Sequence, residues 1–127
     1  MQRVPMAEFE PKLRRRLEQL WGKPVNLYRA LGNQPALLAA WTEFFNAIRH
    51  ESRTPRGLRE IMILRTAQIA RSEYEWAHHL AMARKAGVRE GQIAELASWR
   101  ASTRFDDRER AALALTEAVT ACNVTDD

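Results

Sequence analysis

The chain has 127 residues and a formal net charge of +4, a length typical of one domain that buries a core without disulfide bonds. Alanine (20) and leucine (13) outnumber valine, isoleucine and threonine (17 together), with only five glycines and five prolines, which favours helices over a sandwich or barrel. The single cysteine, Cys122, excludes an internal disulfide, a CxxC redox pair and a cysteine-rich zinc site.

The charge pattern argues against nucleic acid as a partner. Seventeen arginines and three lysines are interleaved with 16 acidic residues, and the one dense basic run lies within residues 12–16. Mixed charge of this kind is typical of solvated helix surfaces. No apolar run reaches the ~18 residues of a membrane span, and residues 1–25 lack a signal-peptide core. We therefore expect a cytoplasmic protein without a membrane partner, and the arginine- and alanine-rich composition favours a bacterial origin.

The first part of the chain predicts three helices. Residues 1–10 are expected to form a flexible arm, followed by a helix over 11–21 with a proline at its first position. A short helix is expected over 25–31. Asn33 is predicted to cap a longer helix with Pro35 in its first turn. The apolar face of that helix would consist of Leu37, Leu38, Trp41, Phe44, Phe45 and Ile48.

The middle of the chain predicts two helices joined by a tight turn. Thr54 is predicted to cap the first, with Pro55 at its first helical position. Residues 58–70 are apolar nearly all round, which is typical of a central, buried helix. Residues 72–75 read Ser-Glu-Tyr-Glu, the pattern of a capping box that starts the second helix. Ala86 and Gly87 are a typical end for it.

The last part predicts a short helix over 90–99 and a final helix that is capped by Asp106 or Asp107 and continues to about residue 121. No segment alternates like a strand. We therefore predict an all-α fold of about six or seven helices in a single domain over residues 1–127.

Among the three histidines, His79 is the candidate for chemistry. It lies one helical turn from Glu75 on a face of small apolar side chains, and an imidazole is the commonest general acid/base. A buried histidine that serves packing alone is the simpler alternative. The adjacent His78 points about 100° away, so no metal site is expected. His50 ends a helix, where it suits the dipole.

Two glutamates accompany His79. Glu60 lies in the most apolar helix, where a buried carboxylate needs a partner. Arg56 or Arg59 would supply a plain ion pair, but antiparallel packing of the two central helices would also bring Glu60 to His79. Glu75 is explained equally well by the capping box and by a role beside His79.

Three stretches carry a family resemblance. Residues 57–65 (GLREIMILR), 72–79 (SEYEWAHH) and 83–88 (ARKAGV), together with Ile93, resemble the carboxymuconolactone decarboxylase family, which includes the AhpD-like alkylhydroperoxidases. The resemblance implies an all-helical fold with a central helical hairpin, and a homo-oligomer (trimer or hexamer) with its pocket near subunit contacts. Larger relatives continue beyond the position of Val119, so the C-terminal portion is expected to be short or absent.

The peroxidase branch of that family has the motif Cys-x-x-Cys-x-x-x-His. When this motif is placed on His79, the two cysteine positions hold Ser72 and Glu75, which cannot exchange disulfides. The chain thus resembles the branch without the cysteines. The resemblance implies that Glu60, Glu75 and His79 are catalytic residues of one pocket, with no cofactor.

The functional hypothesis is a cofactor-free lyase or isomerase that acts on a small anionic, carboxylated or lactone-like compound. His79 would move the proton and Glu60 or Glu75 would orient it, while Arg65 or Arg71 would bind a substrate carboxylate. Ser72 and Trp76 complete the candidate substrate-binding set, although packing is the simpler role for Trp76. The alternatives are a non-catalytic binding or assembly module, a relative of the alkylhydroperoxidases without peroxidase activity, and a redox partner that uses Cys122.

Overall fold

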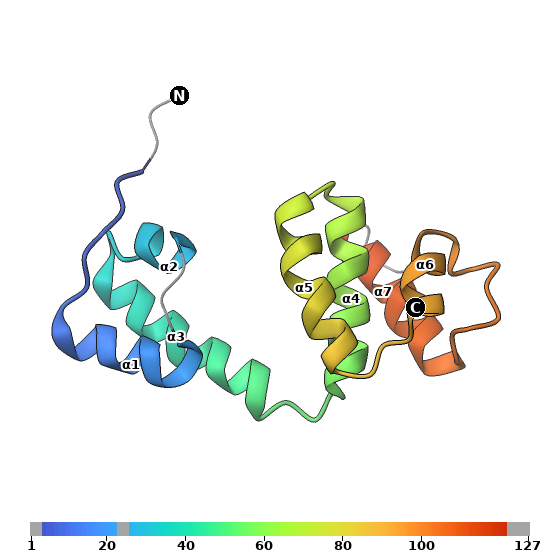
Figure 1. Ribbon diagram of the computed structural model, residues 1–127, viewed down its shortest axis with the longest axis horizontal. Helices are drawn as coiled ribbons and strands as arrows, with labels where there is room; N and C mark the ends of the chain where they lie inside the picture. Colours follow the sequence, from blue (N-terminus) through green and yellow to red (C-terminus); the bar gives the residue numbers. More distant parts are fainter. Residues whose placement is uncertain (1–3, 23–25, 122–127) are drawn as a thin grey trace. The chain divides into compact units, whose positions relative to one another are not determined.

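The computed structural model describes residues 4–22 and 26–121, and every regular element in these ranges is a helix (Figure 1). There are seven α-helices and one 3-10 helix in this part of the chain, which confirms the predicted all-α class. No helix in the same ranges is long and apolar enough to cross a membrane. The contacts gather into two compact units, Met1–Arg53 and Thr54–Asp127, which are described one at a time. The single domain over 1–127 stays a prediction.

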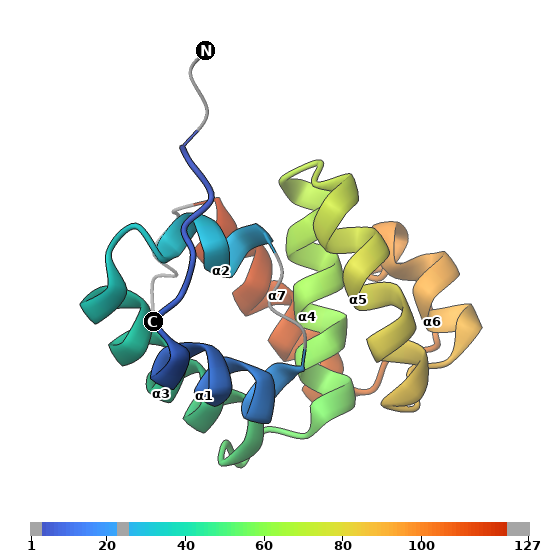
Figure 2. The ribbon, with the colours of Figure 1, turned by 60° about the vertical axis from the view of Figure 1, so that its left-hand side comes forward.

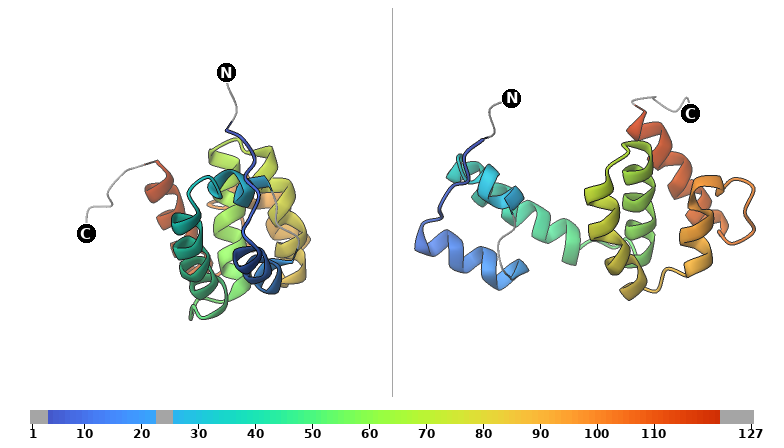
Figure 3. Two further views of the ribbon diagram at one scale, coloured as in Figure 1. Left: turned by 90° about the vertical axis from the view of Figure 1, so that its left-hand side faces the viewer. Right: turned by 45° about the horizontal axis from the view of Figure 1, so that its top comes forward.

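The first unit contains α1 (Pro11–Trp21), α2 (Asn26–Leu31) and α3 (Pro35–His50), which Figure 3 shows in two further views. One buried side chain from each helix forms its core: Leu17, Tyr28 and Leu38. Beside them Trp41 stacks on Phe45, with 4.0 Å between the ring centroids. Three helices this short are stable only through such shared burial. The predicted helix over 11–21 and the start of α3 at Pro35 are confirmed.

The predicted N-cap of α3 was wrong. Gln34, not Asn33, is its N-cap, because the Asn33 amide donates hydrogen bonds to the carbonyl oxygens of Ala30 (2.9 Å) and Pro5 (2.7 Å). The predicted apolar face is buried only in part: Leu38 is fully buried, whereas Leu37 and Phe44 are 59% and 62% exposed. Periodicity identifies an apolar face but not what covers it.

The segment before α1 contacts the helices that follow it. The amide of Ala7 donates to the carbonyl oxygen of Arg29 over 3.0 Å, and Glu8 pairs with both Arg14 and Arg29. A side chain at Gly32 would lie 2.7 Å from the ring of Phe9, so glycine allows this close approach. The flexibility expected of residues 1–10 stays a prediction.

The second unit is built around α4 (Arg56–Ile69), which has α5 (Glu73–Lys85) on one side and α7 (Asp107–Thr120) on the other (Figures 1 and 2). A short α6 (Glu90–Glu95) and the 3-10 helix η1 (Leu96–Ser98) connect α5 to α7. Its core lies between these helices and consists of Ile61, Leu64, Ala83, Val88, Ile93, Leu96, Trp99, Phe105 and Leu113. The prediction of a central helix at this position is therefore confirmed.

Helix α4 starts one residue later than expected. Its N-cap is Pro55 rather than Thr54, because Pro55 has an extended ψ of 140° and lies just outside the helix. Proline fits both the cap and the first helical position, since its fixed φ suits either. The caps at Ser72 and Asp106 lie where the sequence predicted them, and each accepts a hydrogen bond from the backbone amide three residues later.

The hairpin of α4 and α5 is held at both ends. At the turn, Arg71 adopts a left-handed φ of 51°, and the amide of Ser72 donates to the carbonyl oxygen of Ala67 over 2.9 Å. At the open end, a side chain at Gly57 would lie 3.2 Å from the carbonyl oxygen of Ala86. The tight turn and the close approach together set which residues of the two helices face each other.

Glu117 on α7 connects three elements of the second unit. Its Oε1 accepts from the indole Nε1 of Trp99 (2.8 Å) and from Arg65 Nη2 (2.6 Å), and its Oε2 accepts from Arg100 Nη2 (2.6 Å). Burial raises the pKa of the Glu117 carboxyl, but the hydrogen bonds from Trp99, Arg65 and Arg100 outweigh burial, so the pKa lies below its ordinary 4.5. The carboxylate is therefore stabilised by the folded structure.

We expect Glu117→Gln to lower the free energy of unfolding at pH 7 by about 1–3 kcal/mol, because the neutral amide cannot pair with both arginines. Since the folded-state pKa is lowered, the carboxylate contributes fully above the unfolded-state value and loses its contribution as the pH falls through the folded-state value. Denaturant unfolding of both proteins should thus show a difference that is constant well above pH 4.5 and shrinks on acidification.

The control is Glu90→Gln, which removes an exposed pair with Arg84 (side chains 68% and 51% exposed) and should change stability little. A Glu117→Gln effect as small as that of the control, or one that persists at about pH 3, would contradict the role of the charge.

Candidate functional site

Glu60 on α4 and His79 on α5 face each other across the hairpin. The turn at residues 70–72 begins ten residues after Glu60 and ends seven residues before His79, and antiparallel helices bring residues at similar distances from a turn close to one another. Glu60 Oε2 lies 2.8 Å from His79 Nδ1. Glu60 is fully buried, and the His79 side chain is 14% exposed. The structure therefore contains the Glu60–His79 contact that antiparallel packing of the two helices predicted.

The polarity of this hydrogen bond decides which histidine atom can react. An ionised carboxylate only accepts hydrogen bonds, so beside an ionised Glu60 the ring proton of neutral His79 is on Nδ1, which donates a hydrogen bond to Oε2. In the neutral ring Nε2 then has a free lone pair and is the atom that can take up a proton. Orientation of a histidine by a buried carboxylate is a common arrangement in acid/base catalysis.

Glu75 lies on the other side of the imidazole. Its Oε2 is 3.5 Å from His79 Nε2, and its side chain is 45% exposed. The three groups form a row from the buried Glu60 through His79 to the half-exposed Glu75. The row connects a buried charge to solvent through one titratable ring.

Ser72 shows why the carboxylate of Glu75 is available. The Ser72 hydroxyl caps α5 by accepting from the amide of Glu75 over 3.3 Å, which is the first half of the predicted capping box. The second half would need the Glu75 carboxylate to accept from the amide of Ser72, but that amide donates to the carbonyl oxygen of Ala67 across the turn. Glu75 therefore contributes its backbone to the cap and its side chain to His79.

Arg56 and Met82 complete the surroundings of Glu60. Arg56, one turn before Glu60 on α4, places Nη2 2.5 Å from Glu60 Oε1 and 3.5 Å from the sulfur of Met82. Sequence reasoning offered the Arg56–Glu60 pair only as an alternative to the His79 contact. In the structure both exist, one on each oxygen of the carboxylate. Nothing in the sequence indicated that Met82 contacts Arg56, apart from its position one turn after His79 on the same helix.

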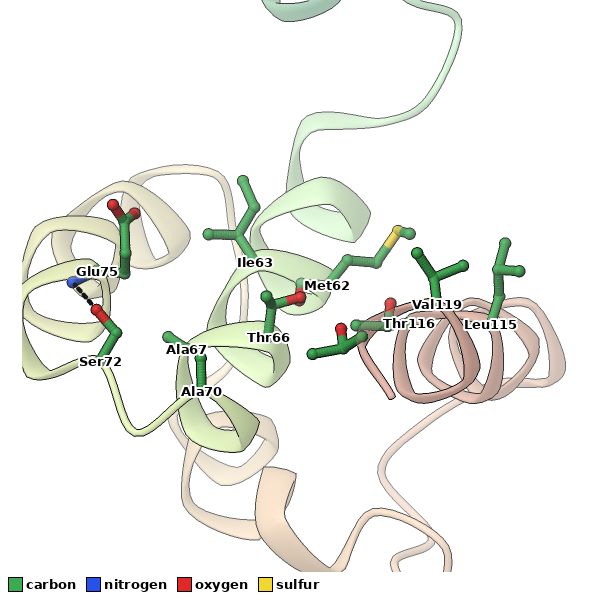
Figure 4. Close-up of a pocket in the computed structure, with 11 residues that line it drawn as sticks. Met62, Ile63, Thr66, Ala67, Ala70, Ser72, Glu75, Leu115, Thr116 and Val119 are labelled. Atoms are coloured by element: carbon green, nitrogen blue, oxygen red, sulfur yellow. Dashed lines mark hydrogen bonds between the residues drawn. The ribbon is translucent and has the colours of Figure 1, made fainter. Parts of the chain in front are cut away.

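An apolar groove of about 430 Å³ lies beside this row (Figure 4). Glu75 and Ser72 stand at one edge, and Leu115, Thr116 and Val119 of α7 form the other, with α4 as the floor. None of the described residues that line it is an arginine or a lysine, and His79 is not among them. The groove thus offers an apolar surface with one carboxylate at its edge.

The remaining candidate substrate-binding residues lie in different places. Arg65 is occupied by Glu117 and by Gln68 (Nη1–Oε1 2.9 Å), so the structure does not bring it to His79. Arg71 is exposed at the turn, between the two groove residues Ala70 and Ser72. Trp76 packs against the core of the second unit, which agrees with packing as its simpler role.

The other histidines lie outside the row, and the His78 ring meets the His79 ring edge to face with 5.5 Å between the centroids. His78 is exposed and stacks on Tyr74 with the rings nearly parallel, and His50 ends α3. Cys122 lies outside the described residues. Within residues 4–22 and 26–121, no group of three or more His, Cys, Asp and Glu side chains is arranged to hold a metal.

Ser72→Ala should lower the free energy of unfolding by about 1 kcal/mol, because the cap of α5 is lost. Ser72→Asp should restore most of that loss, since an aspartate is an equally good N-cap. Denaturant titrations of the three proteins measure this. If Ser72→Asp were as unstable as Ser72→Ala, the hydroxyl would not be acting as a cap.

Comparison with known protein families gives a match over most of the second unit and part of the first. A sequence model of the carboxymuconolactone decarboxylase family matches residues 35–118, which include α3, the Glu60–His79 hairpin and most of α7. No curated protein and no solved structure matches the chain. The family match covers well over half of the sequence, and the chain therefore belongs to the carboxymuconolactone decarboxylase family.

Proposed function

We propose that the protein is a cofactor-free acid/base lyase or isomerase that acts on a small carboxylated or lactone-like compound. The observation that carries the proposal is the row of Glu60, His79 and Glu75, with a buried carboxylate 2.8 Å from Nδ1 of the imidazole. A histidine oriented in this way presents Nε2 on the solvent side, beside the half-exposed Glu75. A carboxylate-oriented imidazole of this kind is suited to act as a general acid/base near neutral pH.

In the lyase reaction, the bond between a substrate carbon and its carboxylate breaks and CO₂ leaves. The electron pair moves into a conjugated carbonyl as an enolate, and a protonated His79 donates its Nε2 proton to the carbon. In the isomerase reaction, neutral Nε2 removes a proton from a carbon next to the carbonyl and returns it to another carbon. In both cases Glu60 stabilises the imidazolium, and Glu75 connects Nε2 to solvent.

The apolar lining of the groove is suited to bind the ring or chain of a small, largely apolar substrate. Its lining is mainly aliphatic and contains Glu75 at one edge, so a ring could lie over α4 with its reacting carbon toward the row. Arg71, exposed at the adjoining turn, is the candidate partner of a substrate carboxylate. Arg65 does not suit that role, because Glu117 occupies its guanidinium.

The second candidate is a non-catalytic binding or assembly module on the same scaffold. The observation in its favour is that His79 does not line the groove. The two candidates differ in whether the protein turns over a substrate, and in whether any turnover depends on His79.

His79→Gln should reduce turnover of carboxymuconolactone by about 10²–10⁴-fold, the usual contribution of a general acid/base. Turnover can be followed by CO₂ release, and the isomerase reaction by deuterium uptake from D₂O into the unsaturated lactone. His78→Gln is the matched control, because it removes the neighbouring exposed imidazole and should retain activity. Full activity in His79→Gln would refute the mechanism. A wild-type protein inactive in both assays would favour the non-catalytic module.

We also propose that the protein forms a homotrimer or a hexamer, as its family membership implies. Support comes from large apolar side chains exposed within each unit, such as Leu37 and Phe44 on α3 and Leu115 and Val119 on α7. Exposed apolar surface on this scale is typical of a surface that another protein covers.

Native mass spectrometry should give three or six times the chain mass of 14.6 kDa. Phe44→Asp should shift the distribution toward smaller species, since it puts a charge into a contact that excludes water. Tyr74→Asp, which puts the same charge at an exposed aromatic side chain on α5, is the control. A monomer at micromolar concentration would contradict the assembly.

A further inference from the structure

Arg56 has a contact on each side of the central hairpin. It is the first residue of α4, one turn before Glu60, and its Nη2 lies 2.5 Å from Glu60 Oε1. The same nitrogen donates to the sulfur of Met82 on α5 over 3.5 Å. Its side chain is 33% exposed, so the guanidinium extends from the surface to a carboxylate that water does not reach.

The two oxygens of Glu60 therefore face different partners. Oε1 faces the Arg56 guanidinium and Oε2 faces the His79 imidazole. Burial without a cation nearby favours the neutral form of a carboxyl group, and an adjacent cation favours the charged form. A guanidinium remains protonated throughout the accessible pH range, so Arg56 provides a permanent positive charge at this point.

The charge of Glu60 determines where the proton of neutral His79 resides. An ionised Glu60 only accepts, which keeps the proton on Nδ1 and leaves Nε2 bare. A protonated Glu60 can donate to Nδ1, which would leave that nitrogen as the acceptor and move the ring proton to Nε2. The two states present opposite atoms to the solvent side of the ring. Only the first has a base next to Glu75.

We propose that Arg56 is a positioning residue: it keeps Glu60 ionised and thereby fixes His79 in the tautomer whose Nε2 is free to accept a proton. Arg56 does not itself reach the reacting atoms, because Glu60 lies between it and the ring. The consequence for turnover rests on the proposed function of His79, but the effect on the tautomer does not.

Met82 adds a geometric constraint to this arrangement. It lies on α5 one turn beyond His79, and its sulfur accepts from the nitrogen that pairs with Glu60. The guanidinium is thus held between a charge on α4 and a polarisable atom on α5. A lysine would supply the charge without the planar group, so the two roles of Arg56 can be separated by substitution.

The test uses the full-length protein with ¹⁵N-labelled histidine and no ligand. Long-range ¹H–¹⁵N spectra distinguish the two neutral tautomers of a histidine, and His79→Gln assigns the signals of that ring. The variants are Arg56→Met, which keeps the bulk of the side chain and loses the charge, and Arg56→Lys, which keeps the charge. Arg84→Met is the matched control, because it removes an arginine of α5 that pairs with Glu90 and not with Glu60.

We expect wild type, Arg56→Lys and Arg84→Met to have the proton of neutral His79 on Nδ1, and Arg56→Met to have it on Nε2. An unchanged Nδ1 tautomer in Arg56→Met would overturn the proposal, as would an Nε2 tautomer in the wild type. If Arg56→Met does not fold by circular dichroism, Arg56→Gln replaces it, with the same expected and contradicting results.

Turnover provides a second readout. Arg56→Met should lower kcat by about 10–100-fold, as is typical when a group that orients a reacting histidine is lost, and Arg56→Lys should restore part of it. If the tautomer changes in Arg56→Met but the wild type is inactive on every lactone, the proposed function fails and the role of Arg56 stands. If turnover depends on His79 while the tautomer is unaffected by Arg56→Met, the proposed function stands and the role of Arg56 fails.

Discussion

A fully buried carboxylate is the constraint on which the second unit depends. Glu60 sits in the central helix, among side chains that exclude water, and an isolated charge there would be prohibitively unfavourable. In the structure, Arg56 from the same helix pairs with one oxygen of this carboxylate and His79 from the next helix contacts the other. Both partners must keep their positions for the charge to persist. The alignment of α4 with α5 and the orientation of the imidazole are consequences of the same requirement.

The hairpin provides that alignment with short-range devices. The left-handed residue at Arg71 and the cap at Ser72 define the turn, and Gly57 permits close contact at the other end. On the opposite side of α4, Glu117 links α7 to Arg65 and to the indole of Trp99. Helix α4 is thus anchored by buried or half-buried charges on two faces, in addition to its apolar packing. Such directional contacts specify one arrangement where apolar contacts alone would tolerate several.

Much of this could be predicted from the sequence because its signals are local. Residues 72–75 and Asp106 carry helix-start patterns that act within one turn, and Gly87 ends α5 for the same reason. Once the turn is placed, the antiparallel register brings Glu60 and His79 together. The N-cap of α4 is Pro55 rather than the predicted Thr54. The sequence could not decide between them, because proline fits both the N-cap and the first helical position.

The features that escaped prediction depend on contacts between distant residues. The Glu117 network joins residues 52 apart in sequence, and no spacing rule connects them. The capping box failed in its second half because the amide of Ser72 bonds to Ala67 across the turn. The exposure of Leu37 and Phe44 depends on which other elements pack against α3. The periodicity of the sequence carries no information about those elements. Local chemistry predicted where helices start, but not which partners their side chains take.

The incomplete capping box has a consequence for how this scaffold can change. The start of α5 depends on the side chain at position 72 but only on the backbone at position 75. Residue 75 can therefore be exchanged for another side chain without loss of the cap, while a change at residue 72 weakens the helix start unless another capping side chain replaces it. The hairpin thus separates a position that maintains the structure from a neighbouring position at which new chemistry can evolve beside the same histidine.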